Sequence, residues 1–120
     1  MFQRGIRGAI TVEENSIVAI KNATVELVSE IIEKNDIKTS DIAFTIFTLT
    51  KDLNAAFPAK FAREELNFNL VPMMCYNEAE INGSIKMCLR VLITVNTLKA
   101  QDEIKHVYLK GAKILREDLK

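Results

Sequence analysis

Five basic side chains in this sequence have the chemistry to hold a small anion. They are Arg7, Lys60, Arg63, Arg90 and Arg116. A guanidinium presents a rigid fork of N–H donors that fits a carboxylate, and an ammonium adds a compact positive charge. Arg90 is the most informative because it stands between Leu89 and Val91 in an apolar run, where an unpaired buried charge would cost several kcal/mol. Together these residues predict binding of a small polyanion.

Each charge also has a purely structural interpretation, which the sequence leaves open. Arg90 would equally fit an edge strand, where it reaches solvent, or a core ion pair with a glutamate. Arg7 fits a solvated strand position, and Lys60 and Arg63, three residues apart, fit the solvated face of a short helix. Glu78 fits an ordinary acidic loop.

Cysteine and histidine are too few for a common metal centre. Cys75, Cys88 and the single His106 cannot form a zinc site within one subunit. The spacing gives no support to a nucleophilic pair of Cys75 and His106, and buried reduced thiols are the favoured interpretation. Phosphate-loop and nucleophile-elbow motifs are also missing from the sequence. We therefore expect no metal and no cofactor, and an enzyme with these residues would act by positioning and electrostatics.

The elements that must position these side chains are one long helix, one short helix and about five strands. Apolar residues recur every three or four positions across 16–34, which predicts a helix with Asn15 as its N-cap, and Pro58 opens the short helix. Strands are predicted over 2–12, 42–50, 70–76 and 85–95, with one or two further short strands in 104–109 and 112–115 and a turn at Asn82-Gly83. The predicted fold class is α+β, with a mixed sheet.

Length, charge and hydropathy limit the class of protein. The 120 residues fit one domain spanning 1–120. Sixteen basic and sixteen acidic residues cancel, whereas a nucleic-acid binder usually carries a basic excess. With no apolar run of about 18 residues, we expect no membrane partner and a cytoplasmic location. Two helices cannot cover both faces of a sheet whose strands are apolar on both sides, so a second copy of the chain is expected there.

Five separated blocks of the sequence carry a family resemblance. They are Arg4-Gly5-Ile6-Arg7-Gly8-Ala9, Ala56-Phe57-Pro58-Ala59-Lys60, Val71-Pro72 leading to Cys75, Cys88-x-Arg90-Val91, and His106-Val107-Tyr108-Leu109 followed by Leu115-Arg116. In this order they closely resemble the monofunctional chorismate mutases of the small α/β class (the AroH class). The resemblance implies a homotrimer with a pseudo-α/β-barrel core and active sites in clefts between subunits. It also implies the Claisen rearrangement of chorismate to prephenate, on the route to phenylalanine and tyrosine, without a covalent intermediate.

The resemblance further implies a role for each matching side chain. Arg90 donates to the ether oxygen of the breaking bond. Arg7 binds the side-chain carboxylate beside Tyr108, and Glu78 accepts from the ring hydroxyl with help from Cys75. The remaining substrate-binding residues are Phe57, Ala59 and Leu115 as apolar walls, Lys60, Arg63 and Arg116 at the cleft mouth, and Met73 and Met74 as lining.

One departure from the family pattern and two alternative functions stand beside this resemblance. Met73-Met74 stands where relatives carry smaller side chains, one with a hydroxyl, so only backbone groups of Met74 can bond substrate there. The alternatives are a non-catalytic trimer of the same fold that binds a small carboxylate, and another trimeric enzyme such as an enamine/imine deaminase. Retention of Arg7, Glu78 and Arg90 argues against the scaffold, and the five blocks argue against the deaminase.

Overall fold

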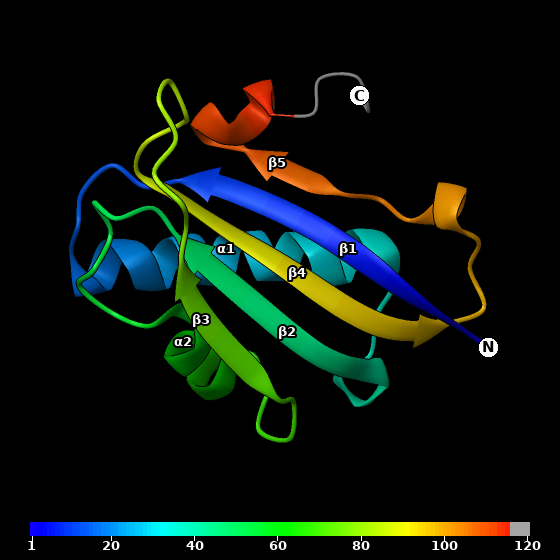
Figure 1. Ribbon diagram of the computed structural model, residues 1–120. Helices are drawn as coiled ribbons and strands as arrows, with labels where there is room; N and C mark the ends of the chain where they lie inside the picture. The colour runs from blue at the N-terminus through cyan, green and yellow to red at the C-terminus, as the bar shows by residue number, and fades with distance from the viewer. Residues whose placement is uncertain (116–120) are drawn as a thin grey trace.

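Five strands form one mixed sheet in the computed structural model, which describes residues 1–115 (Figure 1). The strands are β1 (Phe2–Thr11), β2 (Ile42–Leu49), β3 (Met73–Asn77), β4 (Cys88–Thr97) and β5 (Val107–Leu109). Their order across the sheet is β3-β2-β4-β1-β5. β4 is antiparallel to both of its neighbours, whereas the outer strands β3 and β5 are parallel to the strands they join. The edge-strand interpretation of Arg90 is therefore wrong, because β4 is the central strand.

Both helices pack on the same face of the sheet, behind it in the view of Figure 1. They are α1 (Ile17–Asn35) and α2 (Pro58–Glu65), and the short 3₁₀ helices are η1 (Thr39–Asp41), η2 (Gln101–Glu103) and η3 (Lys110–Ile114). The predicted α+β class, with a long helix, a short helix and a five-stranded mixed sheet, is confirmed. Among the helices within residues 1–115, none combines the length and the apolar character needed to cross a membrane.

The ends of α1 are defined by a side-chain cap at Ser16 and by the backbone conformation of Asp36. Ser16 is the N-cap, and its hydroxyl accepts a hydrogen bond from the backbone N–H of Ala19. The predicted cap, Asn15, is wrong: its side chain instead accepts from the backbone N–H of Asn54 at 2.9 Å. At the other end Asp36 adopts φ 51, the left-handed conformation in which helices commonly stop.

The core lies between α1 and the helix-facing side of the sheet. Ile6 and Ile10 of β1 are fully buried there, together with Leu27 and Ile31 of α1. Gly8 lies between the two isoleucines, and a Cβ at this position would come within 2.6 Å of Ile31 Cδ1. The missing side chain thus lets α1 pack closely against β1.

The opposite face of the sheet, which we call the open face, has neither α1 nor α2 on it. Its residues alternate with the core residues and are Gly5, Arg7 and Ala9 of β1, Phe44, Ile46 and Thr48 of β2, Met74 and Tyr76 of β3, Cys88, Arg90 and Leu92 of β4, and Tyr108 of β5. Within residues 1–115 one end of this face is covered by η3, whose Ala112 packs on Ala9 and Cys88. Within one chain β2 is therefore covered on one side, and its apolar second side is open, with Phe44 37% exposed.

Four predicted strands differ from the observed ones. The strand expected over 104–109 is the shorter β5, which begins at Val107. The strand expected over 85–95 begins at Cys88, because Met87 has φ 51 and cannot continue an extended strand. The strand expected over 70–76 is the shorter β3, an edge strand as the proline before it requires. The strand expected at 112–115 is wrong, since this segment lies in and just after η3.

A Gly8→Ala substitution tests the packing of α1 on β1. We expect it to lower the free energy of unfolding by about 1–3 kcal/mol, because the added methyl must displace Ile31 in a packed core. Urea denaturation at fixed protein concentration measures this. Gly5→Ala is the matched control, since its Cβ would lie 3.3 Å from the flexible end of Leu92 on the open face. An equal effect of the two substitutions would contradict the packing argument.

Candidate active site

The open face carries a cavity of about 250 Å³ near its middle. It is lined by Arg7, Gly8, Ala9, Ile46, Thr48, Arg90, Val91, Leu92 and Tyr108. Three residues to which the resemblance gives polar roles, Arg7, Arg90 and Tyr108, thus come together from three adjacent strands, β1, β4 and β5. Strand register places them here, because side chains on one face of a sheet recur at every second residue.

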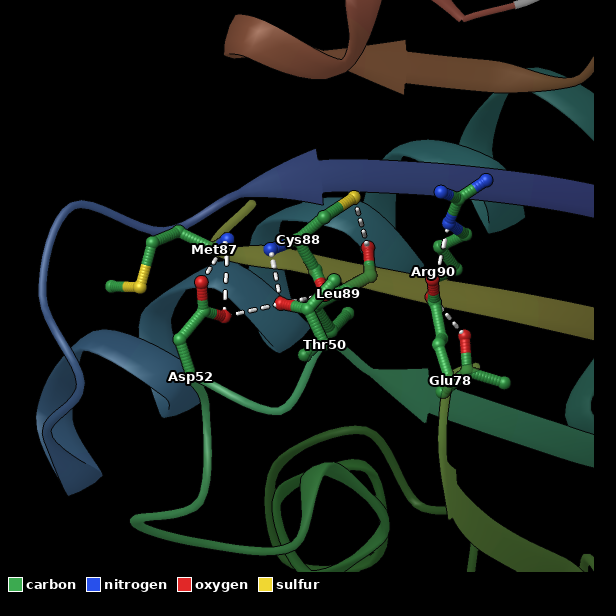
Figure 2. Close-up of polar contacts among 8 residues, drawn as sticks. Thr50, Asp52, Glu78, Met87, Cys88, Leu89 and Arg90 are labelled. Atoms are coloured by element: carbon green, nitrogen blue, oxygen red, sulfur yellow. Dashed lines mark hydrogen bonds and ion pairs between the residues drawn. The ribbon is translucent and has the colours of Figure 1, made fainter. Parts of the chain in front are cut away.

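Arg90 is held on the central strand with a neighbour on each side. It pairs in register with Thr48 of β2 and with Ala9 of β1. Its Nε lies 3.0 Å from Oε2 of Glu78, and its side chain keeps 30% of its surface exposed (Figure 2). The core ion pair with a glutamate, one of the two alternatives for Arg90, is therefore the correct one, and Glu78 is the partner.

Glu78 follows directly after β3 and turns its side chain toward the open face. Its backbone N–H donates to the Leu49 carbonyl at 2.9 Å, which ties it to the end of β2. The Thr48 hydroxyl donates to Glu78 Oε2 at 2.6 Å. With its side chain only 18% exposed, this carboxylate is a fixed negative charge beside Arg90 and not a mobile loop group.

Tyr108 presents an unusual polar atom to the cavity. Its hydroxyl is buried and has no hydrogen-bond partner among residues 1–115, although buried hydroxyls are normally paired. Tyr108 pairs in register with Ala9, two residues from Arg7. The Arg7 backbone N–H donates to His106 Nδ1 at 2.9 Å, which fixes the two segments together. A ligand oxygen in the cavity would satisfy the tyrosine hydroxyl.

A second cavity, of about 470 Å³, lies where α2 meets β3. It is lined by Phe57, Ala59, Lys60, Arg63, Glu64, Met73, Met74 and Cys75. The structure thus collects seven further predicted site residues, but at the outer edge of the sheet. Phe57, the residue before α2, is 71% exposed, so its ring is an uncovered apolar wall.

One chain does not bring its two cavities onto the same side of the sheet. Cys75 pairs with Phe47, whose side chain is fully buried on the helix-facing side, whereas Arg90 pairs with Thr48 on the open face. Glu78 turns its carboxylate to the open face as well. The expected assistance of Cys75 to Glu78 is therefore not found within one chain.

The two remaining predicted residues lie near the end of the described chain. Leu115 packs against the small cluster of Ala9, Cys88 and Ala112, next to the open-face cavity. Arg116 lies outside the described residues.

Both cysteines are neutral thiols at physiological pH. Burial raises the pKa of Cys88 to about 11, although the charge of the neighbouring Arg90 acts in the opposite direction. Burial also raises the pKa of Cys75, although a hydrogen bond from the Ala59 backbone and the charge of Arg63 act to lower it. Cys75 on β3 and His106 beside β1 belong to opposite ends of the strand order, so a nucleophile–base pair of these two residues does not form in one chain.

No cluster of three or more potential metal ligands occurs within residues 1–115.

Three residues that support the site were missed by sequence reasoning. Thr48 holds Glu78, as described above, and Asp52 accepts from the Met87 backbone N–H at 3.1 and 3.0 Å (Figure 2). Thr50 donates to Asp52 and accepts from the Cys88 backbone N–H at 3.0 Å. The alternation of Thr48 at the end of β2 and Thr50 just after it was the available sequence pattern. It could not identify Glu78 and Cys88 as their partners, because these lie 30 and 38 positions away along the chain.

Comparison with known proteins now identifies the family. The family model described as "Chorismate mutase type I" matches residues 3–119. The chain belongs to this family. It is similar to "Chorismate mutase AroH" of Bacillus subtilis (strain 168), with 44% identity over 119 residues that cover 99% of this chain and 94% of the relative. "Chorismate mutase AroH" of Thermus thermophilus is 46% identical over 117 residues, covering 97% and 95% of the two chains.

A solved structure agrees with the sequence relatives. A chorismate mutase from Clostridium thermocellum matches with a TM-score of 0.90 and 48% identity, over 92% of this chain and 98% of that chain. The resemblance inferred from the five sequence blocks is confirmed, and the protein is an isomerase with the activity of a chorismate mutase. The alternative of a non-catalytic trimer is not favoured by these comparisons.

The state of Cys88 can be tested with a thiol reagent. At pH 8 a thiol with a pKa of about 11 has roughly one molecule in a thousand ionised, and only the thiolate reacts. We expect iodoacetamide to leave Cys88 unmodified in the native Cys75→Ala variant and to modify it fully in 8 M urea (about the concentration that unfolds most domains), with mass spectrometry as the readout. Rapid modification of native Cys88 would instead mean that Arg90 stabilises a thiolate beside it.

Proposed function

We propose that this protein converts chorismate to prephenate, for phenylalanine and tyrosine synthesis, by holding the substrate against the fixed charges of Arg90 and Glu78. The observation that supports this most directly is the open-face cavity. It combines a guanidinium on a central strand with a buried tyrosine hydroxyl that lacks a partner among residues 1–115. A small dianion with several oxygens would satisfy both groups.

The reaction requires little from the protein except position and charge. It is an intramolecular rearrangement in which a C–O bond lengthens while a C–C bond forms, so no proton is transferred and no covalent enzyme intermediate is needed. In the transition state the ether oxygen gains negative charge and the ring gains positive charge. A preorganised cation at that oxygen stabilises the transition state more than the substrate.

We assign the developing negative charge to Arg90. Its Nε faces Glu78 in an ion pair that lacks hydrogen-bond geometry. The two terminal nitrogens of the guanidinium are the donors that we propose for the ether oxygen. Glu78, held close to Arg90, is proposed to accept from the ring hydroxyl and to lie near the positive ring. Arg7 and Tyr108, adjacent on β1 and β5, are proposed to bind the side-chain carboxylate.

The cavity at α2 and β3 supplies the groups proposed for the rest of the substrate. Lys60 and Arg63, both exposed on α2, are proposed to attract the dianion to the cleft mouth, together with Arg116. Phe57, Ala59, Met73 and Leu115 are proposed as apolar walls, Met74 as a source of backbone contacts, and Cys75 as a weak donor.

We further propose that the protein is a homotrimer in which each active site is shared by two neighbouring chains. The open face carries apolar side chains that a soluble domain normally buries, among them Phe44, Ile46 and Leu92. The two groups of site residues lie on different sides of one sheet, as the registers of Cys75 and Arg90 indicate. One ligand can contact both groups if the edge at α2 and β3 of one chain meets the open face of the next.

Replacement of Arg90 tests the proposed mechanism. We expect Arg90→Ala to lower kcat by about a hundredfold to a thousandfold, the usual cost of removing one preorganised donor to a developing oxyanion. Arg90→Lys should restore little, because the fork geometry is lost. The assay is the loss of chorismate ultraviolet absorbance without added cofactor, with circular dichroism as the control for folding. A folded Arg90→Ala variant that turns over at close to the wild-type rate would refute the assignment.

Mixed oligomers test whether the site is shared. Arg90→Ala disables the open-face group, and Lys60→Glu, at an exposed position, reverses the charge of the other group. If random trimers form from equal amounts of the two chains, about one quarter of the clefts combine an intact Arg90 with an intact Lys60 from different chains. The co-refolded mixture should then approach a quarter of wild-type activity. Activity no higher than the mean of the two separate variants would show that each site is built from one chain.

A further inference from the structure

We propose that Thr48 is a positioning residue that orients the Glu78 carboxylate for the reaction, an inference that rests on the roles proposed for Glu78 and Arg90. The Thr48 hydroxyl donates to Glu78 Oε2 at 2.6 Å. Arg90 Nε lies 3.0 Å from the same oxygen. A single carboxylate oxygen thus accepts a hydrogen bond from β2 and forms an ion pair with a cation on β4.

Backbone geometry fixes this arrangement at both ends of Glu78. Thr48 and Arg90 are direct cross-strand partners on the open face, so their side chains start side by side. The Glu78 backbone N–H donates to Leu49, the residue after Thr48, at 2.9 Å. Two consecutive β2 residues therefore hold the backbone and the carboxylate of Glu78.

The hydroxyl restricts how the carboxylate meets the guanidinium. A carboxylate that is free to rotate beside an arginine favours a bidentate pair, in which both oxygens engage two N–H groups. Such a pair would occupy a terminal N–H of Arg90 that the ether oxygen needs. By fixing Oε2 near Nε, Thr48 keeps the contact monodentate. The other carboxylate oxygen of Glu78, Oε1, is then left for the ring hydroxyl.

The test is an isosteric exchange that removes the hydroxyl. Thr48→Val should lower kcat/KM by about tenfold to a hundredfold, the range for losing one hydrogen bond to a charged group. Most of the loss should fall on kcat, because the hydroxyl acts on the charges that meet the transition state. Thr48→Ser, which keeps the hydroxyl, should stay within about threefold of wild type, and Thr48→Ala repeats the measurement if the valine variant does not fold.

Thr45→Val is the matched control. Thr45 lies on the same strand but on the helix-facing side, fully buried, and its Oγ1 has no hydrogen-bond partner among the described residues. The same chemical change there should leave kcat/KM within about twofold of wild type.

A double-mutant cycle separates a positioning role from a general loss of structure. In a Glu78→Ala background, Thr48→Val should have no further effect, because the carboxylate it orients is gone. Failure of the serine variant to restore activity, an undiminished valine effect without Glu78, or a Thr48→Val enzyme as active as wild type would each overturn the proposal. Full activity of the single variants Glu78→Ala and Arg90→Ala would instead overturn the proposed function itself. These two measurements therefore distinguish a failure of the proposed function from a failure of the role proposed for Thr48.

Discussion

The contact between Arg90 and Glu78 is the constraint on which the open face depends. The guanidinium lies on the central strand of a five-stranded sheet and is only partly exposed, and a nearby carboxylate compensates its charge. That carboxylate comes from a residue just after an edge strand and is held by β2. The start of β4 is fixed in turn by Asp52 and Thr50. Two polar clusters therefore support this region, one that holds Glu78 beside Arg90 and one that fixes the start of β4.

The alternation of side chains along the strands gives the two faces of the sheet different roles, one in the core and one in the open-face cavity. Every second residue of β1, β2 and β4 builds the core against α1, and the residues between them form the open face. The same rule puts Cys75 and Arg90 on different sides. The shared site that we propose between neighbouring chains would follow directly from the twofold period of a strand, combined with a sheet that has α1 and α2 on one face only.

Local patterns predicted the elements better than their ends or their contacts. The alternating apolar residues of β4 and the helical period of α1 identify both elements, since each pattern depends only on near neighbours. The first residue of β4 depends on Met87, whose N–H is held by Asp52, 35 residues earlier. A glutamate partner for Arg90 was one of two alternatives that the sequence left open. Which glutamate it is depends on how β3 pairs with β2. Thr48 was missed for the same reason, because a threonine in a strand has no distinctive local pattern.

Arg7 and Gly8 are neighbours on β1, so the register of this strand decides both the packing of α1 and the lining of the open-face cavity. Gly8 is the position at which α1 comes closest to the sheet, and Arg7 lines the open-face cavity. A slip of β1 by one residue would drive a guanidinium into the packed helix and leave a glycine in its place beside Tyr108. Such a misregistered chain would be too unstable to accumulate, so the fold has no long-lived, compact but inactive form that differs only in how β1 is aligned.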